Sequence, residues 1–220
     1  MVEPVKARAY NSPRRREQAA ATRRSVLEAA GRRFEEHGYA GTTVAAIAAD
    51  AGVSLKTVYL AFATKAGVLR ALWNERLRGD ADDVPVADRD WYRAVLDEPD
   101  PARKLRLNAR NSRAGKIRLG GVLEVVRSGA ESDPEIAALW ERIQSEFHAN
   151  QRAIVEGIAA KDALAPGLKV DRATDILWTL NHPTVWLLLS RERGWTAEDY
   201  EQWFGDAACA LLLGSRPEAS

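Results

Sequence analysis

Residues 51–62 read AGVSLKTVYLAF, and they interrupt one alanine-rich run and start a second amphipathic run at once. Gly52 suits a left-handed backbone position, which strains a residue that carries a β-carbon. Ser54 suits a helix N-cap, because its hydroxyl can accept a hydrogen bond from a free amide in the first turn. The stretch therefore predicts two short helices that cross at a steep angle. Their shared core is expected to contain Ile47, Ala51, Val53, Val58 and Phe62.

The sequence on either side of this turn has the apolar spacing of helices rather than of strands. Val26, Ala30 and Phe34 recur every four residues, which predicts a helix that ends at Gly38. Thr42 and Thr64 suit the N-caps of two more helices. Together with the helix capped by Ser54, the expected elements cover residues 17–37, 43–51, 55–62 and 65–78.

The charges divide the chain near Gly79. Residues 1–79 contain 14 Lys and Arg against 7 Asp and Glu, whereas the remainder contains 18 against 24. A basic first third indicates a polyanionic partner for that part only. A linker, GDADDVPVADRD, begins at Gly79, because Gly, Pro and aspartates replace the helical spacing there. The expected parts are a flexible basic arm at 1–17, a first domain at 18–79 and a second domain at 80–220.

The second domain is also expected to be helical, which makes the whole chain an all-α protein. Its apolar spacing predicts helices at about 90–96, 101–127, 134–162, 171–192 and 196–213. Gly115, Gly120 and Gly121 are expected to loosen the second of these helices. Pro183 lies inside the fourth, where a proline removes a backbone hydrogen bond and frees carbonyl groups.

Composition and motifs argue against several classes of protein. No stretch approaches the roughly 20 apolar residues of a membrane span, and the N-terminus lacks the apolar core of a signal peptide, so we expect a cytoplasmic location. Cys209 is the single cysteine and the three histidines lack metal-ligand spacing, so no disulfide, metal site or cofactor is expected. Gly115-Lys116 lacks the other residues of a phosphate-binding loop, and no nucleophile, base and orienting acid occur together. We therefore do not expect an enzyme.

Three motifs follow one another in the first domain. FEEHGY occupies 34–39, TTVAAIAADAGVS occupies 42–54, and TVY at 57–59 precedes Phe62 and Lys65. This series resembles the DNA-binding domain of TetR-family transcriptional regulators. The resemblance implies an N-terminal three-helix helix-turn-helix domain that binds double-stranded DNA, and a C-terminal helical domain for ligand binding and dimerisation.

The resemblance also implies which residues contact DNA. Thr43, Tyr59 and Lys65 correspond to usual phosphate contacts, while Leu55, Lys56 and Leu60 occupy positions that commonly face bases. Among hydrogen-bond donors on the second short helix, Thr57 also suits a contact to the DNA backbone.

Two features of this surface leave alternatives open. Lys56 is the best candidate for reading a guanine edge, and a phosphate contact is the alternative; Leu60 suits a thymine methyl group. Arg14, Arg15 and Arg16 are expected along the DNA backbone or in the minor groove, and solvated charge is the alternative.

The last two helices are expected to pair two subunits. Apolar side chains surround the helix between residues 176 and 189 nearly completely, which requires burial on more than one side. A homodimer with a four-helix contact would bury them, and one large monomeric core is the alternative. Two recognition helices about 34 Å apart would then read a roughly palindromic operator.

A ligand pocket is expected near the helix that Pro183 interrupts, with aromatic walls and a few polar anchors. The candidates are Asn108, Asn111, Trp140, Phe147, His148, Trp178, Asn181 and His182. For each of them alone, a core or surface role is the alternative. The favoured function is a repressor that a small apolar or aromatic effector releases from its operator. The alternatives are a regulator of the same fold controlled by abundance or by a protein partner, and a helical enzyme with an incidental helix-turn-helix.

Overall fold

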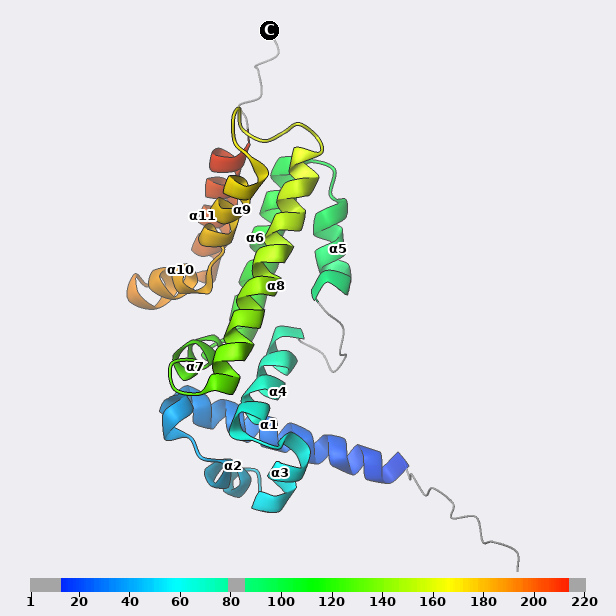
Figure 1. The fold of residues 1–220 in the computed structure, drawn as a ribbon, viewed down its shortest axis with the longest axis vertical. Helices are drawn as coiled ribbons and strands as arrows, with labels where there is room; N and C mark the ends of the chain where they lie inside the picture. Colours follow the sequence, from blue (N-terminus) through cyan, green and yellow to red (C-terminus); the bar gives the residue numbers. More distant parts are fainter. Residues whose placement is uncertain (1–12, 79–85, 214–220) are drawn as a thin grey trace, which may run out of the picture. The chain divides into compact units, whose positions relative to one another are not determined.

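The computed structural model describes residues 13–78 and 86–213, and helices account for nearly all of them (Figure 1). Over these two ranges the single β pairing is an isolated bridge between Leu164 and Leu213. The all-α class predicted from the sequence is confirmed. The chain divides into two compact units between Leu72 and Trp73, which lies inside a helix rather than at the predicted boundary, Gly79.

The first unit contains α1 (Pro13–Gly41), α2 (Val44–Asp50), α3 (Leu55–Phe62) and the first part of α4 (Lys65–Arg78). Its core comes from one stripe of α1 and from the inner faces of the other helices. The buried apolar residues include Val26, Ala30, Phe34, Ile47, Ala48, Val58, Phe62, Val68 and Leu69. Ala51 and Val53, which were expected in the shared core, are half-buried.

The first helix starts earlier than the sequence predicts. α1 begins at Pro13, so Arg14, Arg15 and Arg16 lie on a helix and not in the flexible arm expected over residues 1–17. Proline is favoured at the first helical position, and the Arg, Glu, Gln and Ala that follow are strong helix formers. Residues 1–12 of the predicted arm lie outside the described residues.

Hydroxyl side chains set the helix starts. Ser54 Oγ accepts from the Thr57 amide at 3.1 Å, and Thr64 Oγ1 accepts from the Gly67 amide at 2.9 Å, as predicted. The prediction for Thr42 is wrong, because Thr43 caps α2. Thr42 is buried instead, and its hydroxyl donates to backbone carbonyls at the end of α1, where Gly38 interrupts the helix with φ 68°.

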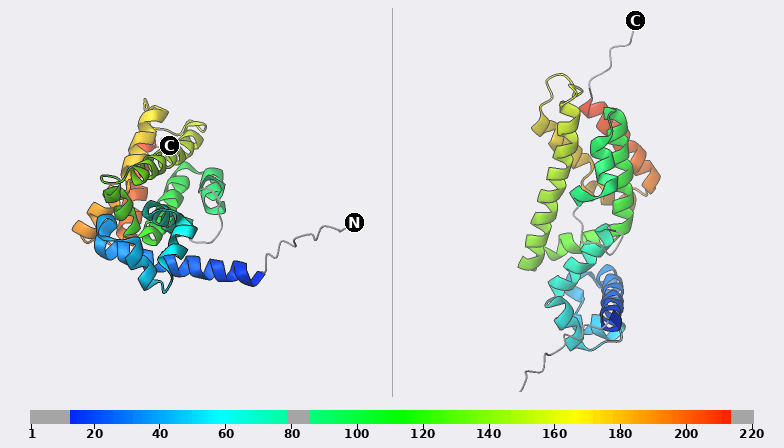
Figure 2. Two further views of the ribbon diagram at one scale, coloured as in Figure 1. Left: turned by 60° about the horizontal axis from the view of Figure 1, so that its bottom comes forward. Right: turned by 90° about the vertical axis from the view of Figure 1, so that its right-hand side faces the viewer.

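The second unit contains most of the chain, and α6, α8, α9 and α11 run alongside one another in it (Figures 1 and 2). Its elements are η1 (Val86–Asp88), α5 (Asp90–Asp97), α6 (Pro101–Leu119), α7 (Val122–Gly129), α8 (Pro134–Ala159), α9 (Val170–Leu180), α10 (Pro183–Leu187), η2 (Leu188–Glu192) and α11 (Ala197–Leu212). α6 packs against α11, and α8 packs against α9.

Two helices that the sequence predicts as continuous are each divided. α6 ends at Leu119, because Gly120 takes φ 52° and ends the helical hydrogen bonding before α7 begins. The helix expected over 171–192 stops at Leu180 and restarts at Pro183, with His182 as the N-cap of α10. Proline cannot donate to the preceding turn, so a helix start relieves the conflict that a continuous helix would create.

No single helix in the described ranges is long and apolar enough to cross a membrane, and only the bent pair of α2 and α3 reaches that length and composition together.

α3 ends in a strained turn that supports a stability prediction. Ala63 has φ 63° and ψ −50°, and the Thr64 amide donates across it to the Phe62 carbonyl at 2.8 Å. A residue that carries a β-carbon destabilises the folded protein by about 1–3 kcal/mol in such a conformation.

Ala63→Gly is therefore expected to raise the free energy of unfolding by about 0.5–1 kcal/mol, measured by urea denaturation. Ala61→Gly, in the helix just before Ala63, is the control and should lower the free energy of unfolding by about 1 kcal/mol. If the two substitutions changed the free energy of unfolding equally, Ala63 would not be strained.

Candidate functional site

The turn between α2 and α3 gives the first unit its protruding helix. The two helix axes differ in direction by 112°. Gly52 has φ 66° with open space where a β-carbon would stand, and the Val53 amide donates to the Ala48 carbonyl at 3.0 Å. This angle lies within the range of DNA-binding helix-turn-helix motifs. The break between the two runs of sequence thus sets α3 at a steep angle to α2.

α3 has one buried face and one exposed face. Val58 and Phe62 are buried in the core of the first unit. On the other face, Leu60 is 79% exposed, Tyr59 is 48% exposed and Leu55 is 43% exposed. Lys56 is exposed beside them. The structure therefore brings four of the predicted DNA-facing residues to one accessible surface.

The two threonines predicted at this surface have structural partners as well. Thr43 is exposed, and its hydroxyl oxygen accepts from the Ala46 amide at 3.1 Å, which leaves the hydroxyl proton available to a phosphate. Thr57 is half-buried, and its hydroxyl lies 2.7 Å from the hydroxyl of Ser54. Thr43 therefore presents the more accessible donor of the two.

Lys65, which was predicted to contact a DNA phosphate, has hydrogen-bond partners within its own unit. Its ammonium donates to the Tyr39 carbonyl at 2.9 Å and to the Thr42 carbonyl at 3.2 Å, and it lies 4.1 Å from the centre of the Tyr39 ring. Both carbonyls follow the break in α1, and the Tyr39 carbonyl also accepts from the Thr42 amide at 3.3 Å. Lys65 thus ties the start of α4 to the turn between α1 and α2.

This contact predicts a stability effect for Lys65→Met. Removing the ammonium leaves two half-buried carbonyls without their charged donor, so the free energy of unfolding should fall by about 1–2 kcal/mol in the absence of DNA. Thermal denaturation would measure it, with Arg70→Met, an exposed change on the same helix, as the control expected within about 0.5 kcal/mol of the original protein. Unchanged stability in Lys65→Met would mean that Lys65 serves DNA contact alone.

The arginines at the start of α1 add positive charge to the same unit. Arg14, Arg15 and Arg16 are exposed, and Arg15 lines a shallow groove that also contains Leu60 of α3. Further along α1, the Arg23 guanidinium lies 4.6 Å from the centre of the Phe62 ring. The first turns of α1 and the exposed end of α3 thus share one basic groove.

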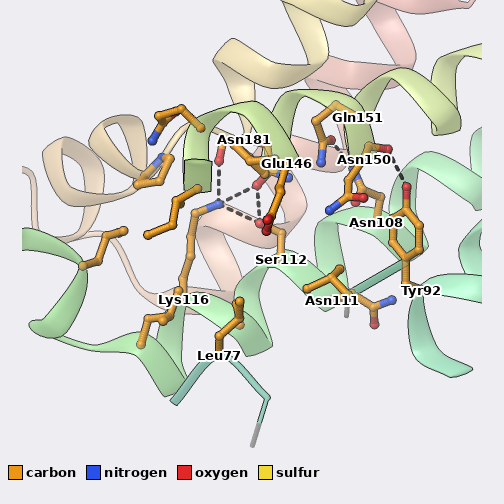
Figure 3. Close-up of a pocket in the computed structure, with 18 of the residues that line it drawn as sticks. Leu77, Tyr92, Asn108, Asn111, Ser112, Lys116, Glu146, Asn150, Gln151 and Asn181 are labelled. Carbon is orange, nitrogen blue, oxygen red and sulfur yellow. Dashed lines mark hydrogen bonds between the residues drawn. The ribbon is translucent and has the colours of Figure 1, made fainter. Parts of the chain in front are cut away.

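A cavity of about 160 Å³ lies inside the second unit (Figure 3). Of the predicted lining residues, Asn108, Asn111, Phe147 and Asn181 contribute to its wall. The predicted residues Trp140, His148, Trp178 and His182 do not.

Three of these four residues form a row of rings that comes from α8, α9 and the start of α10. The ring centres of His148 and Trp178 are 6.2 Å apart, and those of Trp178 and His182 are 4.7 Å apart. His148 follows Phe147 directly on α8, and consecutive helical residues point about 100° apart. Aromatic composition alone therefore could not separate the cavity wall from the neighbouring surface.

A further signal of the cavity lies in the sequence of α6. Asn108, Ser112 and Lys116 recur every four residues along α6 and all line the cavity, with Leu119 one turn further along. Polar residues at helical spacing on a helix that packs on two others indicate a polar face inside the unit. The remaining walls come from elements far apart in sequence, including Trp73, Leu77, Trp91, Tyr92, Leu123 and Gln151.

Lys116 satisfies the carbonyl groups that the helix break frees. Its Nζ donates to the Asn181 carbonyl at 2.9 Å, the Asn181 side chain at 2.5 Å, Ser112 Oγ at 2.6 Å and Tyr200 Oη at 2.8 Å. Tyr200 in turn donates to the Leu180 carbonyl at 3.2 Å. A cation here also complements the negative end of α9. Burial lowers the pKa of the Lys116 ammonium well below its usual value.

Asparagine and tyrosine side chains order the opposite end of the cavity. Tyr92 donates to the Asn150 carbonyl at 2.7 Å, and burial raises the pKa of its hydroxyl to about 12. Asn108 donates to Gln151 Oε1 at 3.1 Å, and Asn111 donates to the Trp91 carbonyl at 2.9 Å. These polar groups are held in place, so the cavity has a fixed set of donors and acceptors.

The chain is similar to known regulators of transcription. A sequence model described as "Bacterial regulatory proteins, tetR family" matches residues 26–72. The Probable HTH-type transcriptional regulator ArpR of Pseudomonas putida is 30% identical over 184 residues, which are 80% of this chain and 85% of that protein. The HTH-type transcriptional regulator TtgR, also of Pseudomonas putida, is 29% identical over 184 residues, with coverage of 80% and 85%.

The solved structures agree on the fold. NalD of Pseudomonas aeruginosa, the secondary repressor of the MexAB-OprM multidrug efflux pump, matches with a TM-score of 0.69 at 21% identity. The match covers 90% of this chain and 98% of NalD.

Proposed function

The chain belongs to the TetR family of bacterial regulatory proteins and is a DNA-binding transcriptional regulator rather than an enzyme; on that premise we propose that it is a homodimeric repressor that a small-molecule effector releases from its operator. The observation that carries the proposal is the combination of an exposed α3 in the first unit with a partly open, mainly apolar cavity in the second. α4 begins in the first unit, and its last turns contribute Trp73 and Leu77 to the cavity wall.

We assign the DNA contacts to the exposed face of the helix-turn-helix. Thr43 and Tyr59 donate to phosphates, with Lys65 limited to a secondary contact because its ammonium already has two carbonyl partners. Leu55 and Leu60 present apolar surface to thymine methyl groups, and Lys56 presents an ammonium to a guanine edge. Arg14, Arg15 and Arg16 follow the DNA backbone beside the helix.

Lys56→Ala tests the base contact. Losing a specific contact to a guanine should weaken operator binding by about 10- to 100-fold, and binding to operators altered at one base pair should become indifferent to that base. Affinities for a series of single-base operator variants would measure this. Lys161→Ala, which removes one charge from the second unit, is the control for a general charge effect. A uniform loss of affinity across all operator sequences would identify a phosphate contact instead. The salt dependence of the affinity would then correspond to about one released counterion fewer.

We place the dimer contact on α10, η2 and α11. Leu188 is 45% exposed and Leu211 is 51% exposed, and both are large apolar side chains. On the same elements, Trp186, Leu187 and Trp203 are only half-buried within one chain. An apolar surface of this kind on a monomer is usually covered by a partner, and a twofold contact would cover both copies at once.

Effector release follows from a shift between two dimer arrangements. An effector that binds better to the arrangement with wrongly spaced α3 helices must weaken operator binding by the same coupling free energy. Operators can be selected from random duplex DNA with the purified protein, and their affinity can then be compared with and without saturating effector. A fall in affinity supports the proposal, and equal affinities would leave a regulator of this family without an effector switch.

A further inference from the structure

The cavity wall contains a buried cation that has only neutral partners. Lys116 is 7% exposed, and its ammonium contacts oxygens of Ser112 and Asn181 (Figure 3). A fourth uncharged oxygen is Tyr200 Oη. In the described part of the chain no carboxylate lies within ion-pair distance of it. Dipoles compensate a buried charge less completely than an opposite charge does, so the site would gain from an anion.

A second donor lies at the same wall. His182 Nδ1 accepts from the Thr184 amide at 3.2 Å, so the ring proton is on Nε2, which lies 3.2 Å from Gln144 Oε1. That contact fixes the orientation of the Gln144 amide, whose nitrogen is buried and has no hydrogen-bond partner among residues 13–78 and 86–213. Gln144 lines the cavity. Lys116 therefore has acceptors that are all neutral, and the buried Gln144 nitrogen has no acceptor among the described residues.

The cavity is partly open, and its volume indicates the size of the group that it can surround. Its volume is about 160 Å³, and a cavity of about 150 Å³ measured in this way holds one benzene ring. Trp73, Trp91, Phe147 and Leu123 supply apolar and aromatic walls. One ring or a short branched chain with a small polar group matches this space.

We propose that the cavity binds a small organic acid with a single apolar ring, whose carboxylate replaces one of the neutral oxygens on the Lys116 ammonium and accepts a hydrogen bond from Gln144. The proposal rests on the proposed function only in taking this cavity as the effector site. It names the chemical class of the effector, which the apolar walls alone do not decide.

Glu146 provides the competing argument for a cationic ligand. Its carboxylate also lines the cavity, and aromatic walls suit a cation. Glu146 is exposed, however, so water and salt screen its charge, whereas Lys116 is buried and its charge is screened far less. The buried charge should therefore decide the ligand class in favour of an acid.

Calorimetric titration of the full-length protein with benzoate, benzamide and benzylammonium tests the proposal, because these probes share a ring and differ in charge. Benzoate should bind about 10- to 100-fold more tightly than benzamide. Lys116→Met and Lys116→Gln should both remove that preference. Lys104→Met is the matched control, because Lys104 is also buried, at 2% exposure, with its ammonium on two carbonyls of α5 and away from the cavity.

Several results would overturn the proposal. They are equal or tighter binding of benzamide, a preference for benzylammonium, a preference for benzoate that survives in the Lys116 variants, or no saturable benzoate binding. The comparison of probes in the unaltered protein is decisive even if a Lys116 variant does not fold.

Operator binding separates this proposal from the proposed function. Benzoate that binds with the stated preference but leaves operator affinity unchanged would support the ligand class and contradict effector release. A neutral compound that releases the operator, with benzoate not bound, would support release and overturn the ligand class.

Discussion

Leu211→Glu is expected to convert the protein into monomers and to weaken operator binding by about 100- to 10,000-fold. Leu211 lies on α11 and is 51% exposed in one chain, so a glutamate there is solvated in the monomer and leaves the fold intact. In the proposed dimer contact the same carboxylate would be buried against apolar side chains without a partner, which opposes association. Each half-site would then be bound independently, without the effective concentration that a linked second site supplies.

The measurement combines sedimentation velocity with operator titration at fixed salt concentration, because phosphate contacts make affinity salt-dependent. Ile117→Glu is the matched control, because Ile117 on α6 is 53% exposed and lies outside the proposed contact. It should keep both the dimer and the affinity. A dimeric Leu211→Glu protein, or a monomer that binds the operator as tightly as before, would contradict the proposed dimer contact or the need for it.

Gly67→Ala is expected to lower the free energy of unfolding by about 3 kcal/mol or more and to abolish operator binding. A β-carbon on Gly67 would stand 1.9 Å from the Phe62 carbonyl oxygen, and that atom belongs to the backbone at the end of α3. The Gly67 amide also donates to Thr64 Oγ1, so the start of α4 is held from both sides. Relief would require α3 and α4 to separate, which would displace the proposed DNA-binding surface.

Gly115→Ala is the control for the intrinsic effect of the change. Gly115 lies in the interior of α6, and the nearest atom to an added β-carbon is a flexible Arg118 nitrogen at 4.0 Å. Alanine should therefore stabilise that helix by about 0.5–1 kcal/mol. Urea denaturation and operator binding of both variants would measure the contrast. Gly67→Ala with the original stability would show that the close contact is not maintained in solution.

The parts of the fold that depend on neighbouring residues could be predicted. Apolar spacing located the helices of the first unit, and Ser54 and Thr64 marked two helix starts correctly. The prediction for Thr42 failed because two adjacent threonines both suit a cap, and only packing decided which of them is buried. The prediction of one helix over 101–127 was wrong for a similar reason, because the pair Gly120 and Gly121 permits a break without requiring one.

The candidate site was predicted less completely than the fold. Exposure of Leu55, Tyr59 and Leu60 follows from the two-sided pattern of α3, whose buried residues recur at helical spacing. Only half of the predicted cavity residues line the cavity, because the direction of each side chain depends on how α6, α8 and α9 are rotated against one another. The polar spacing along α6 marks a face that includes Lys116, but it does not show that the Lys116 ammonium is buried.

The sequence by itself determined the all-helical class, the helix-turn-helix and the breaks at Gly38 and Gly52, because backbone conformation and capping act over a few neighbouring residues. Only the tertiary structure decided that Lys65 turns toward the carbonyls of another helix end, and that Lys116 lies at a cavity wall. Both outcomes depend on partners far away along the chain. Desolvation and hydrogen bonding act through space, so they are set only when the helices have packed.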